Sequence, residues 1–495
     1  MLALAIGLFG VHMVYAARYG IFRDELYYVA CGDHLSFGYV DHPPLVAVMA
    51  RAAHAVFGES VRGLRVIPAL CAAATVILAG ASARALGGGR YAQVLAALAV
   101  VAAPEFLGTF HVLSMNCALP VAWGAAALFA IRAVRAGDAR AWAAFGVACG
   151  VGLEAKHSTL FFGAAIAAGL VVTPARRVLA TRGPWIAIAI AALLFAPNLV
   201  WEQIHGWPTL EFMANAQAKK MVALGPLAFA RAQVENMNPL TFPIWAGGVA
   251  WLLAARAAHP FRFLGVAFVA LFVIVLLGHG KPYYMAPIFP VVYGAGGVAI
   301  EARVRRFVSR AAIAAIVPAT GALLAPFALP VLEPATFPGY AAALGAKPSP
   351  DEKHKMGPLP QFFADQFGWE AMARKVADAY LHLPPEEQRV AALYGENYGE
   401  ASAIAFFGPR WGLPYPVSGH NAYFTWGPPE GTRGAVLIAV GPDEDDLRET
   451  YEEVEKVGET DEPYAMPFEN HQPIFVCRRP KRPLLDVWPS VKLYI

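Results

Sequence analysis

The segment RDELYYVACGDHLSFGYVDHPP, residues 23–44, guides the interpretation of the whole chain. Two adjacent acids, Asp24 and Glu25, stand near its start. Asp41 and His42 stand near its end, before a Pro-Pro step that cannot continue a regular helix. The aromatic residues between them are of the kind found at membrane–water boundaries. One acid would be ordinary in an aqueous loop between membrane spans, but this combination favours a functional site.

Composition places the chain among membrane proteins. Of its 495 residues, 57% are hydrophobic and only 15% are charged, whereas soluble domains carry roughly 25% charged residues. The mean hydropathy is +0.47. The net charge of +3 is too small to indicate a nucleic-acid partner, and the positions of the charges matter more than their sum.

Several common classes of site are not supported by the sequence. The five cysteines contain no C-x-x-C pair, so neither a zinc site nor a disulfide framework is indicated. No G-x-G-x-x-G follows a predicted strand, and no G-x-x-x-x-G-K-[ST] is present. A soluble nucleotide site and ATP-driven transport are therefore unsupported, and an energy-rich substrate is expected to come from the membrane.

Apolar segments of about the length of a membrane span dominate the first two thirds of the chain. Eleven are predicted, at 2–20, 62–83, 91–110, 115–132, 141–157, 159–175, 183–200, 241–256, 262–279, 284–300 and 311–330. The first lacks both a preceding basic region and a convincing cleavage site, so we interpret it as a span rather than a signal peptide.

Arginine residues alternate between the loops that join these spans. The arginine-rich set contains Arg84, Arg90, Arg132, Arg135, Arg140, Arg176, Arg177, Arg182, Arg256, Arg262, Arg303, Arg305, Arg306 and Arg310. Cytoplasmic loops are enriched in basic residues, so these loops are expected in the cytoplasm. Residues 23–44 and the C-terminal part are then expected on the extracytoplasmic side of the cell membrane.

The character of the chain changes near residue 331. A proline-rich linker contains Pro334, Pro338, Pro348 and Pro350, and charged residues become frequent after it. Short strands are predicted at 389–394, 434–440 and 473–477, and amphipathic helices at 361–380 and 443–457. The sequence thus predicts a transmembrane domain at 1–330 and a small extracytoplasmic α/β domain at 331–495.

Polar residues gather at the span ends that face the same side as residues 23–44. They are His111, Ser114, Asn116, Glu154, Lys156, His157, Asn198, Trp201, Glu202, His205, His279, Lys281, Tyr283 and Tyr284. Each group alone is typical of a helix end, because Lys, Tyr and Trp anchor spans at the interface. Their shared side, opposite the acidic segment, favours one site built from several loops.

These residue types suit glycosyl transfer from a lipid phosphate. A carboxylate can remove the proton from an acceptor hydroxyl as it attacks a sugar. Lys281 and tyrosine hydroxyls can hold and neutralise a phosphate leaving group. Adjacent residues do not share a helix or strand face, so either Asp24 or Glu25 is expected to face the substrate. The other would pair with Arg23, Lys156 or a metal ion.

The segment 23–44 and its continuation strongly resemble the first loop of bacterial membrane glycosyltransferases of family 39. These are the protein O-mannosyltransferase-like and aminoarabinose-transferase-like enzymes of the GT-C superfamily. Other parts of the family are similar to GLEAKHS, PNLVWEQIHGWP, GHGKPYYMAPIFP, YGENYGEASAIAFFG and SGHNAYF. The resemblance implies a GT-C fold, a polyprenyl-phosphate sugar donor and transfer with inversion. It also implies that Asp24 is the catalytic acidic residue, with Glu25 beside it, and that Lys281 contacts the lipid phosphate.

The leading hypothesis is therefore a glycosyltransferase with a lipid, glycan or protein acceptor outside the cytoplasm. Asp24 and Glu25 are the candidate catalytic residues. The candidate substrate-binding residues are Arg23, Tyr27, Asp41, His42, Lys156, His157, Glu202, His205, Lys281, Tyr283 and Tyr284. No cofactor is required by the sequence, although Asp24, Glu25 and Asp41 could hold a divalent cation.

Two alternatives belong to other functional classes. A transporter or flippase of a lipid-linked saccharide is expected to show paired inverted halves with broken helices at the bilayer midplane. A membrane-anchored scaffold would leave the polar face of the spans unexplained. The ionisable residues of this chain gather at one surface, which favours chemistry at that surface over passage through the membrane.

Overall fold

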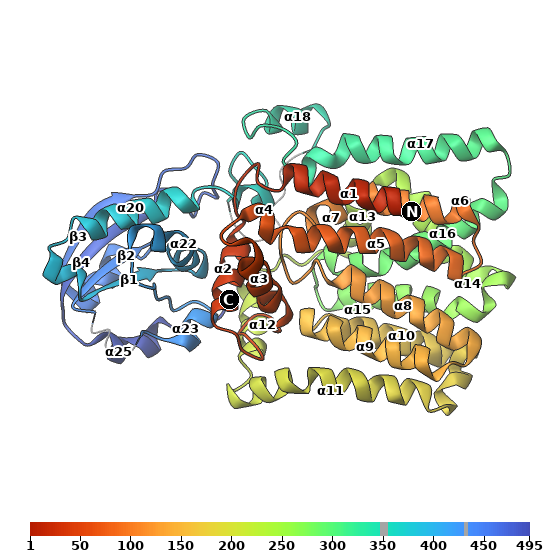
Figure 1. Cartoon of the computed structure of the whole chain (residues 1–495), viewed down its shortest axis with the longest axis horizontal. Helices are drawn as coiled ribbons and strands as arrows, with labels where there is room; N and C mark the ends of the chain where they lie inside the picture. The colour runs from red at the N-terminus through yellow and green to blue at the C-terminus, as the bar shows by residue number, and fades with distance from the viewer. Residues whose placement is uncertain (347–354, 430–433) are drawn as a thin grey trace.

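The computed structural model of the protein describes residues 1–346, 355–429 and 434–495. The linker residues Pro348 and Pro350 lie outside the described residues. Long helices pack side by side at one end of the molecule, and a small sheet with its helices occupies the other end (Figure 1). The N-terminal helices α2 and α3 lie between the two ends.

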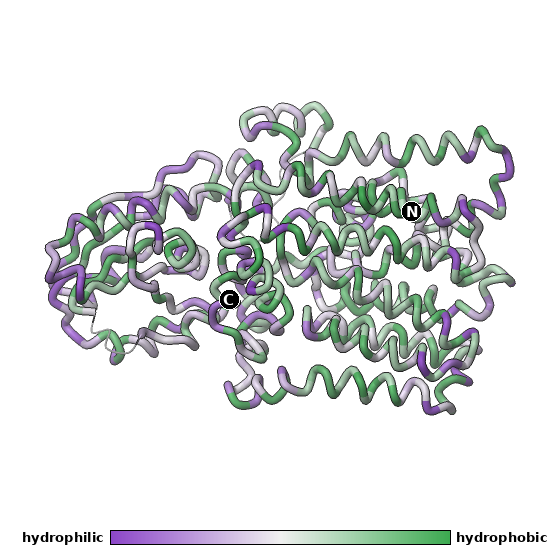
Figure 2. Tube along the Cα trace, in the orientation of Figure 1, coloured by the Kyte–Doolittle hydropathy of each residue, from purple (hydrophilic) through white to green (hydrophobic). Residues whose placement is uncertain are grey.

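The helical part runs from α1 to α17. Its helices are α1 (Leu2–Tyr15), α2 (Arg23–Asp33), α3 (Leu45–Phe57), α4 (Val61–Leu64), α5 (Val66–Ala85), α6 (Arg90–Val101), α7 (Pro104–Thr109), α8 (Leu119–Ala136), α9 (Ala139–Ala155), α10 (Thr159–Val172), α11 (Gly183–Ile204), α12 (Pro208–Lys219), α13 (Pro226–Asn236), α14 (Phe242–Ala254), α15 (Arg262–Leu277), α16 (Phe289–Arg303) and α17 (Phe307–Leu324). Most residues of these helices are hydrophobic, as the green colour shows (Figure 2).

Every segment that the sequence predicts as a span contains a helix. In the described part of the chain, six helices are long and apolar enough to cross a membrane. They become seven if α10 and the 3-10 helix Pro174–Ala180, which meet at 106°, form one span. Leu2–Tyr15, Leu45–Phe57, Arg90–Val101 and Pro239–Ala254 are apolar but shorter. The helical architecture is confirmed, and the number eleven stays a prediction.

Glycines allow these helices to cross closely. A Cβ atom at Gly169 of α10 would overlap the backbone carbonyl of Phe263, where α15 passes. A Cβ atom at Gly296 of α16 would overlap the carbonyl of Ile244 in α14. Small residues at crossings bring helix backbones into van der Waals contact, which stabilises helix pairs where lipid surrounds them.

The segment 23–44 is more regular than an aqueous loop. Its first half forms α2, whose start is capped by the Glu25 carboxylate, which accepts a bond of 2.9 Å from the Phe22 backbone N–H. Its second half folds back onto this helix. The Tyr39 hydroxyl donates to the Cys31 carbonyl at 2.9 Å and accepts from the Ser36 N–H at 3.1 Å. The polar residues at both ends of the segment are therefore held in place.

The C-terminal part contains a four-stranded mixed sheet in the order β1-β2-β4-β3. Its elements are α18 (Phe337–Ala343), α19 (Gln361–Ala364), α20 (Trp369–Leu381), α21 (Pro385–Gln388), β1 (Ala391–Gly395), α22 (Tyr398–Phe407), α23 (Ala422–Trp426), β2 (Val436–Val440), α24 (Glu444–Thr450), β3 (Tyr451–Glu459), β4 (Pro473–Pro480) and α25 (Leu484–Val487). β1 and β2 are parallel, and the other two pairs are antiparallel. The predicted strands at 389–394, 434–440 and 473–477 are confirmed.

Two predicted helices are partly wrong. The helix predicted over 361–380 is interrupted between α19 and α20, where Gly368 has a φ of 90°. The sequence predicts a helix over 443–457, but α24 ends at Thr450 and β3 begins at Tyr451. Tyr451 is buried against the sheet, while most of β3 is exposed and charged. Charged side chains are common on an edge strand, where they discourage pairing with another chain. The same charges resemble the polar face of a helix when only the sequence is considered.

Helix α22 joins the two parts of the molecule. It is nearly entirely buried, and it packs against α2 on one side and α20 on the other. Its first turn is capped by Asn397, whose side-chain oxygen accepts from the N–H groups of Gly399 and Glu400 at 2.8 and 3.2 Å. The sheet region thus presents a rigid helix start to the start of α2.

Candidate active site

The two neighbouring acids of α2 lie in different surroundings. Glu25 is fully buried and pairs with Arg65, the residue that precedes α5, with 2.7 Å between Oε2 and Nη2. Its oxygens also accept backbone N–H bonds from Phe22 at 2.9 Å and Leu113 at 2.8 Å. The carboxylate of Glu25 therefore joins three segments of the chain, whereas that of Asp24 is 30% exposed.

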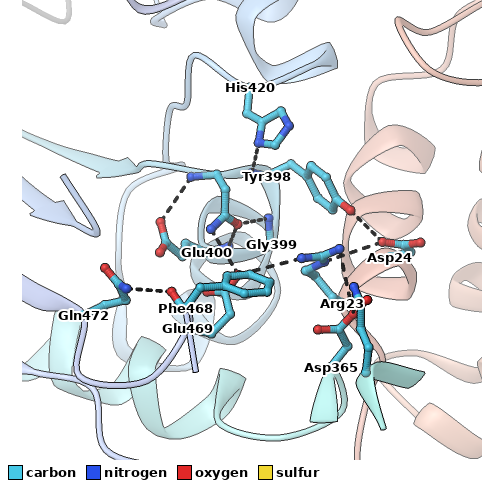
Figure 3. Close-up of polar contacts among 12 residues, drawn as sticks. Arg23, Asp24, Asp365, Tyr398, Gly399, Glu400, His420, Phe468, Glu469 and Gln472 are labelled. Atoms are coloured by element: carbon cyan, nitrogen blue, oxygen red, sulfur yellow. Dashed lines mark hydrogen bonds and ion pairs between the residues drawn. The ribbon is translucent and has the colours of Figure 1, made fainter. Parts of the chain in front are cut away.

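Asp24 is held from the C-terminal part of the chain. The Tyr398 hydroxyl donates a hydrogen bond of 2.8 Å to its Oδ1 atom, and the Arg23 Nε atom lies 3.8 Å from the same oxygen. Figure 3 shows the side chains of Arg23 and Asp24 from α2 facing that of Tyr398 from α22. Sequence reasoning identified both segments but did not pair them.

Arg23 is surrounded by acids and aromatic rings. Its guanidinium lies 3.8 Å from Asp365 and 3.9 Å from Glu469, in addition to Asp24. It also lies over the rings of Tyr398 and Phe468, at 5.2 and 5.9 Å from their centroids (Figure 3). Arg23 thus links the start of α2 to the C-terminal part by charge and by cation–π contacts.

The far end of the segment 23–44 turns back toward α2. The Tyr27 hydroxyl donates to Asp41 Oδ1 at 2.8 Å and accepts from the Ala422 N–H at 3.2 Å. Burial raises the pKa of Asp41, while His42 and the bond from Tyr27 oppose that rise. His42 is fully buried, stacks on Tyr39 with a centroid distance of 4.7 Å, and has its Nδ1 atom 2.8 Å from a backbone carbonyl.

The predicted phosphate ligands come together at the ends of α9 and α15. Lys156 follows α9 and donates to the Asn116 side chain at 2.9 Å. Its ammonium lies 4.3 Å from the ring centroid of Tyr284 and 5.2 Å from that of Tyr283. Both tyrosines belong to the 3-10 helix Pro282–Ile288, which Lys281 precedes.

A cavity of about 620 Å³ connects these elements. Asp24, Ser114, Asn116 and Tyr283 are among its polar lining residues. Much of the remaining wall is apolar, with Val112, Leu324, Phe327, Ala328, Phe337, Ala341 and Phe362. Glu105 and Glu235 also line it. The cavity can therefore accommodate a molecule with a polar end near Asp24 and a hydrophobic portion along α17 and α18.

Three predicted binding residues have local partners at a different place. His157 Nε2 lies 3.4 Å from the Asn198 side chain. Glu202 accepts from the hydroxyl of Thr209 and joins the end of α11 to α12, and His205 stacks on Trp201 with 4.2 Å between centroids. Of the predicted binding residues, Tyr283 lines the cavity that contains Asp24, whereas Lys156, Lys281, Tyr284 and these three do not. Their roles in binding stay predictions.

Arg65 and Tyr398 are the site residues that the sequence analysis missed. Arg65 lies at the start of a predicted span and is only 1% exposed, a burial that only a partner such as Glu25 can compensate. Tyr398 lies in the segment YGENYGEAS, which already resembled the family. That resemblance was the one available signal for Tyr398.

The divalent cation stays an untested prediction. Among the residues that the structure describes, no group of three or more His, Cys, Asp or Glu side chains could hold a metal ion. Of the three acids considered for it, Glu25 is held by Arg65 and Asp41 accepts a hydrogen bond from Tyr27. The described contacts of Asp24 are with Tyr398 and Arg23, and neither indicates a metal site.

Comparisons with known proteins agree with this architecture. Residues 41–201 match the family model of dolichyl-phosphate-mannose-protein mannosyltransferases. The lipid A galacturonosyltransferase RgtD of Rhizobium johnstonii is 26% identical over 257 residues, which are 50% of this chain and 53% of that protein. The chain thus spans about half the length of this curated relative.

A solved structure covers almost the whole chain. The crystal structure of ArnT from Cupriavidus metallidurans bound to undecaprenyl phosphate superposes with a TM-score of 0.61 at 15% identity, covering 96% of this chain and 97% of that one. The apo structure of the same protein gives a TM-score of 0.59. The fold is therefore the GT-C fold, with a helical part followed by a small sheet region. Taken together, these matches confirm the resemblance, with the family match over residues 41–201 and the shared fold over nearly the whole chain.

Proposed function

We propose that this protein transfers a sugar, with inversion of its anomeric centre, from a polyprenyl phosphate to a hydroxyl of an extracytoplasmic acceptor. The observation that carries the proposal is the cavity that combines the partly exposed Asp24 carboxylate with a long apolar wall. Lys156 and Tyr283 stand near its polar end. A lipid-linked sugar phosphate has a polar head that suits the polar end of the cavity and a hydrocarbon chain that suits its apolar wall.

In the proposed reaction, Asp24 is the general base. The acceptor oxygen attacks the anomeric carbon of the sugar as its proton passes to the Asp24 carboxylate. The bond between that carbon and the phosphate oxygen breaks on the opposite side, and the polyprenyl phosphate leaves as an anion. The leaving phosphate needs no acid, so a base is the group that the chemistry requires most.

Lys156, Lys281 and the tyrosines Tyr283 and Tyr284 would bind the phosphate. Cations and hydroxyl donors near a developing anion stabilise it most where water is scarce. Lys156 donates to Asn116, a residue of the cavity wall, which holds its ammonium beside the polar end. ArnT, whose fold this chain shares, was crystallised with undecaprenyl phosphate, and this supports the same class of carrier here.

Glu25 is better suited to position the site than to react. Arg65 and two backbone N–H groups already occupy its oxygens. We therefore assign Glu25 to holding the start of α2, and with it Asp24, against the segment that contains Leu113. In this division of roles, Asp24 faces the substrate and Glu25 forms an ion pair with Arg65.

The membrane arrangement belongs to the same proposal. Eleven spans would place the arginine-rich loops in the cytoplasm and the cavity mouth on the other side. Residues 1–330 would form the transmembrane domain and residues 331–495 an extracytoplasmic domain. A reporter fused after Arg310 should be cytoplasmic, and one fused after residue 340 should lie outside. If both reporters lay on the same side of the membrane, the predicted last span at 311–330 would be wrong.

The function is tested with purified protein and a panel of polyprenyl-phosphate hexoses and pentoses. Lipids and glycans extracted from the cell envelope serve as acceptors, and release of polyprenyl phosphate is measured. Asp24→Asn keeps the size of the side chain but removes its basicity, so a loss of roughly 10²–10⁴-fold in rate is expected. Donor binding should survive. No turnover by the wild-type protein with any donor would refute the proposed function. Near-normal turnover by Asp24→Asn would refute the role of Asp24.

A further inference from the structure

Tyr398, at the start of α22 in the C-terminal part, donates a hydrogen bond to Asp24. It is buried, and burial raises the pKa of its hydroxyl well above the ordinary value. The hydroxyl therefore keeps its proton and acts as a donor. Its ring lies 4.7 Å from that of Tyr27, centroid to centroid, which fixes its direction.

The backbone around Tyr398 is built to hold it. Asn397 caps the start of α22, and the Tyr398 N–H donates to His420 Nδ1 at 3.4 Å (Figure 3). The next residue has to be small, because a Cβ atom at Gly399 would lie 2.7 Å from Cγ of Arg23. Arg23 can therefore pass beside α22 and reach Asp365 and Glu469 while Tyr398 reaches Asp24.

The hydrogen bond and the ion pair of Asp24 use the same oxygen. Tyr398 donates to Oδ1, and Arg23 Nε lies 3.8 Å from Oδ1. Asp24 also lines the cavity. A carboxylate held through one oxygen presents its other oxygen in a fixed direction, and catalytic groups gain from such fixed geometry.

We infer that Tyr398 is a positioning residue for the transfer reaction, so that the C-terminal part of the chain completes the active site. It holds Asp24 through Oδ1 and directs Oδ2 to the acceptor hydroxyl. This inference rests on the proposed function of Asp24 as the base. It gives the C-terminal part a role in the chemical step, in addition to any role in recognising the acceptor.

The test is Tyr398→Phe, which removes one oxygen and keeps the ring. A hydrogen bond to a charged group contributes enough that kcat should fall about 10- to 100-fold. The KM for the polyprenyl-phosphate sugar should change less than about threefold, because Lys156 and Lys281 bind the phosphate elsewhere. Binding of a polyprenyl phosphate without sugar counts the folded molecules, so kcat is obtained per competent molecule even if the variant is less stable.

Tyr451→Phe is the matched control. Tyr451 is also a buried tyrosine of the C-terminal part, and its hydroxyl donates to the Gly434 carbonyl at 3.0 Å, on β3 and outside the cavity. Its removal should leave kcat within about twofold. The inference is overturned if Tyr398→Phe retains wild-type kcat, or if both variants lose kcat equally. Because each result is compared with an active wild-type protein, such a failure is distinct from failure of the proposed function itself.

Discussion

The two neighbouring carboxylates of α2, Asp24 and Glu25, lie in regions of the molecule that surround them differently. Around Glu25, Arg65 and backbone N–H groups fill every side of a buried acid. Around Asp24, a phenol and an arginine hold one oxygen, and a cavity opens beside it. One helical step separates an acid that holds the structure from an acid that we assign to chemistry. Residue type alone would not distinguish them, because the direction in which each side chain leaves the helix decides its role.

The largest effect on stability is expected at Arg65. Arg65→Met leaves the Glu25 carboxylate buried without its counter-charge, which should lower the free energy of unfolding by about 3–5 kcal/mol. Denaturant unfolding in detergent measures the loss. Arg51→Met is the matched control, since Arg51 pairs with Asp33 at 3.0 Å on the surface and should cost less than about 1 kcal/mol. Equal effects of the two substitutions would break the comparison.

Glu25→Gln should separate stability from chemistry. It weakens charge-assisted hydrogen bonds to Arg65, and a loss of about 1.5–3 kcal/mol in unfolding free energy is expected. The turnover of the molecules that remain folded should stay within about tenfold of wild type. Asp24→Asn should show the reverse pattern, with stability kept and turnover lost. If Glu25→Gln were as inactive as Asp24→Asn at full stability, Glu25 would take part in the reaction.

Lys281→Ala tests the proposed phosphate site instead of the two acids of α2. It should weaken donor binding by about 1.5–3 kcal/mol, the range for a charged hydrogen bond, with little effect on unfolding. The KM for the polyprenyl-phosphate sugar is the measurement. Lys492→Ala is the control, because Lys492 pairs with Glu211 at 2.7 Å and both side chains are partly exposed. An unchanged KM in folded Lys281→Ala would remove Lys281 from the phosphate site.

The smallest effect is expected at Asn198. Its side-chain amide donates to the Phe37 carbonyl at 2.9 Å and so fastens the turn between α2 and α3 to α11. Asn198→Ala should cost about 1 kcal/mol of stability. Because this bond lies away from Asp24, turnover of the folded molecules should remain close to wild type. A tenfold loss in kcat would show that the turn, or His157 at 3.4 Å from Asn198, takes part in the reaction.

Local patterns allowed much of the fold to be predicted. Each apolar run that was predicted as a span contains a helix in the structure. Alternating or buried runs correctly predicted β1, β2 and β4. The pattern failed where an edge strand carries helix-like charges, as β3 does from Tyr451 onward. It also failed at α2, because the acids and aromatics that indicated a loop are compatible with a short capped helix.

The site was predictable in its parts but not in its pairings. Asp24, Lys156 and Lys281 were identified from residue type and from the family resemblance, and Lys156 does lie beside Tyr283 and Tyr284. The partners Arg65 and Tyr398 stand 40 and 374 positions from Glu25 and Asp24. No local periodicity encodes such pairs, because they depend on how helices and sheet pack in three dimensions.

The distance along the chain between Asp24 and Tyr398 also sets a timetable for synthesis. A ribosome must add 374 residues after Asp24 before its hydrogen-bond partner exists. At the usual elongation rate, that interval lasts roughly 20 to 75 seconds. During this time the first helices can already be in the membrane, while Arg23 and Asp24 still lack Tyr398 and Glu469. A nascent chain would therefore contain the proposed base without its partners until the C-terminal part of the chain has been synthesised.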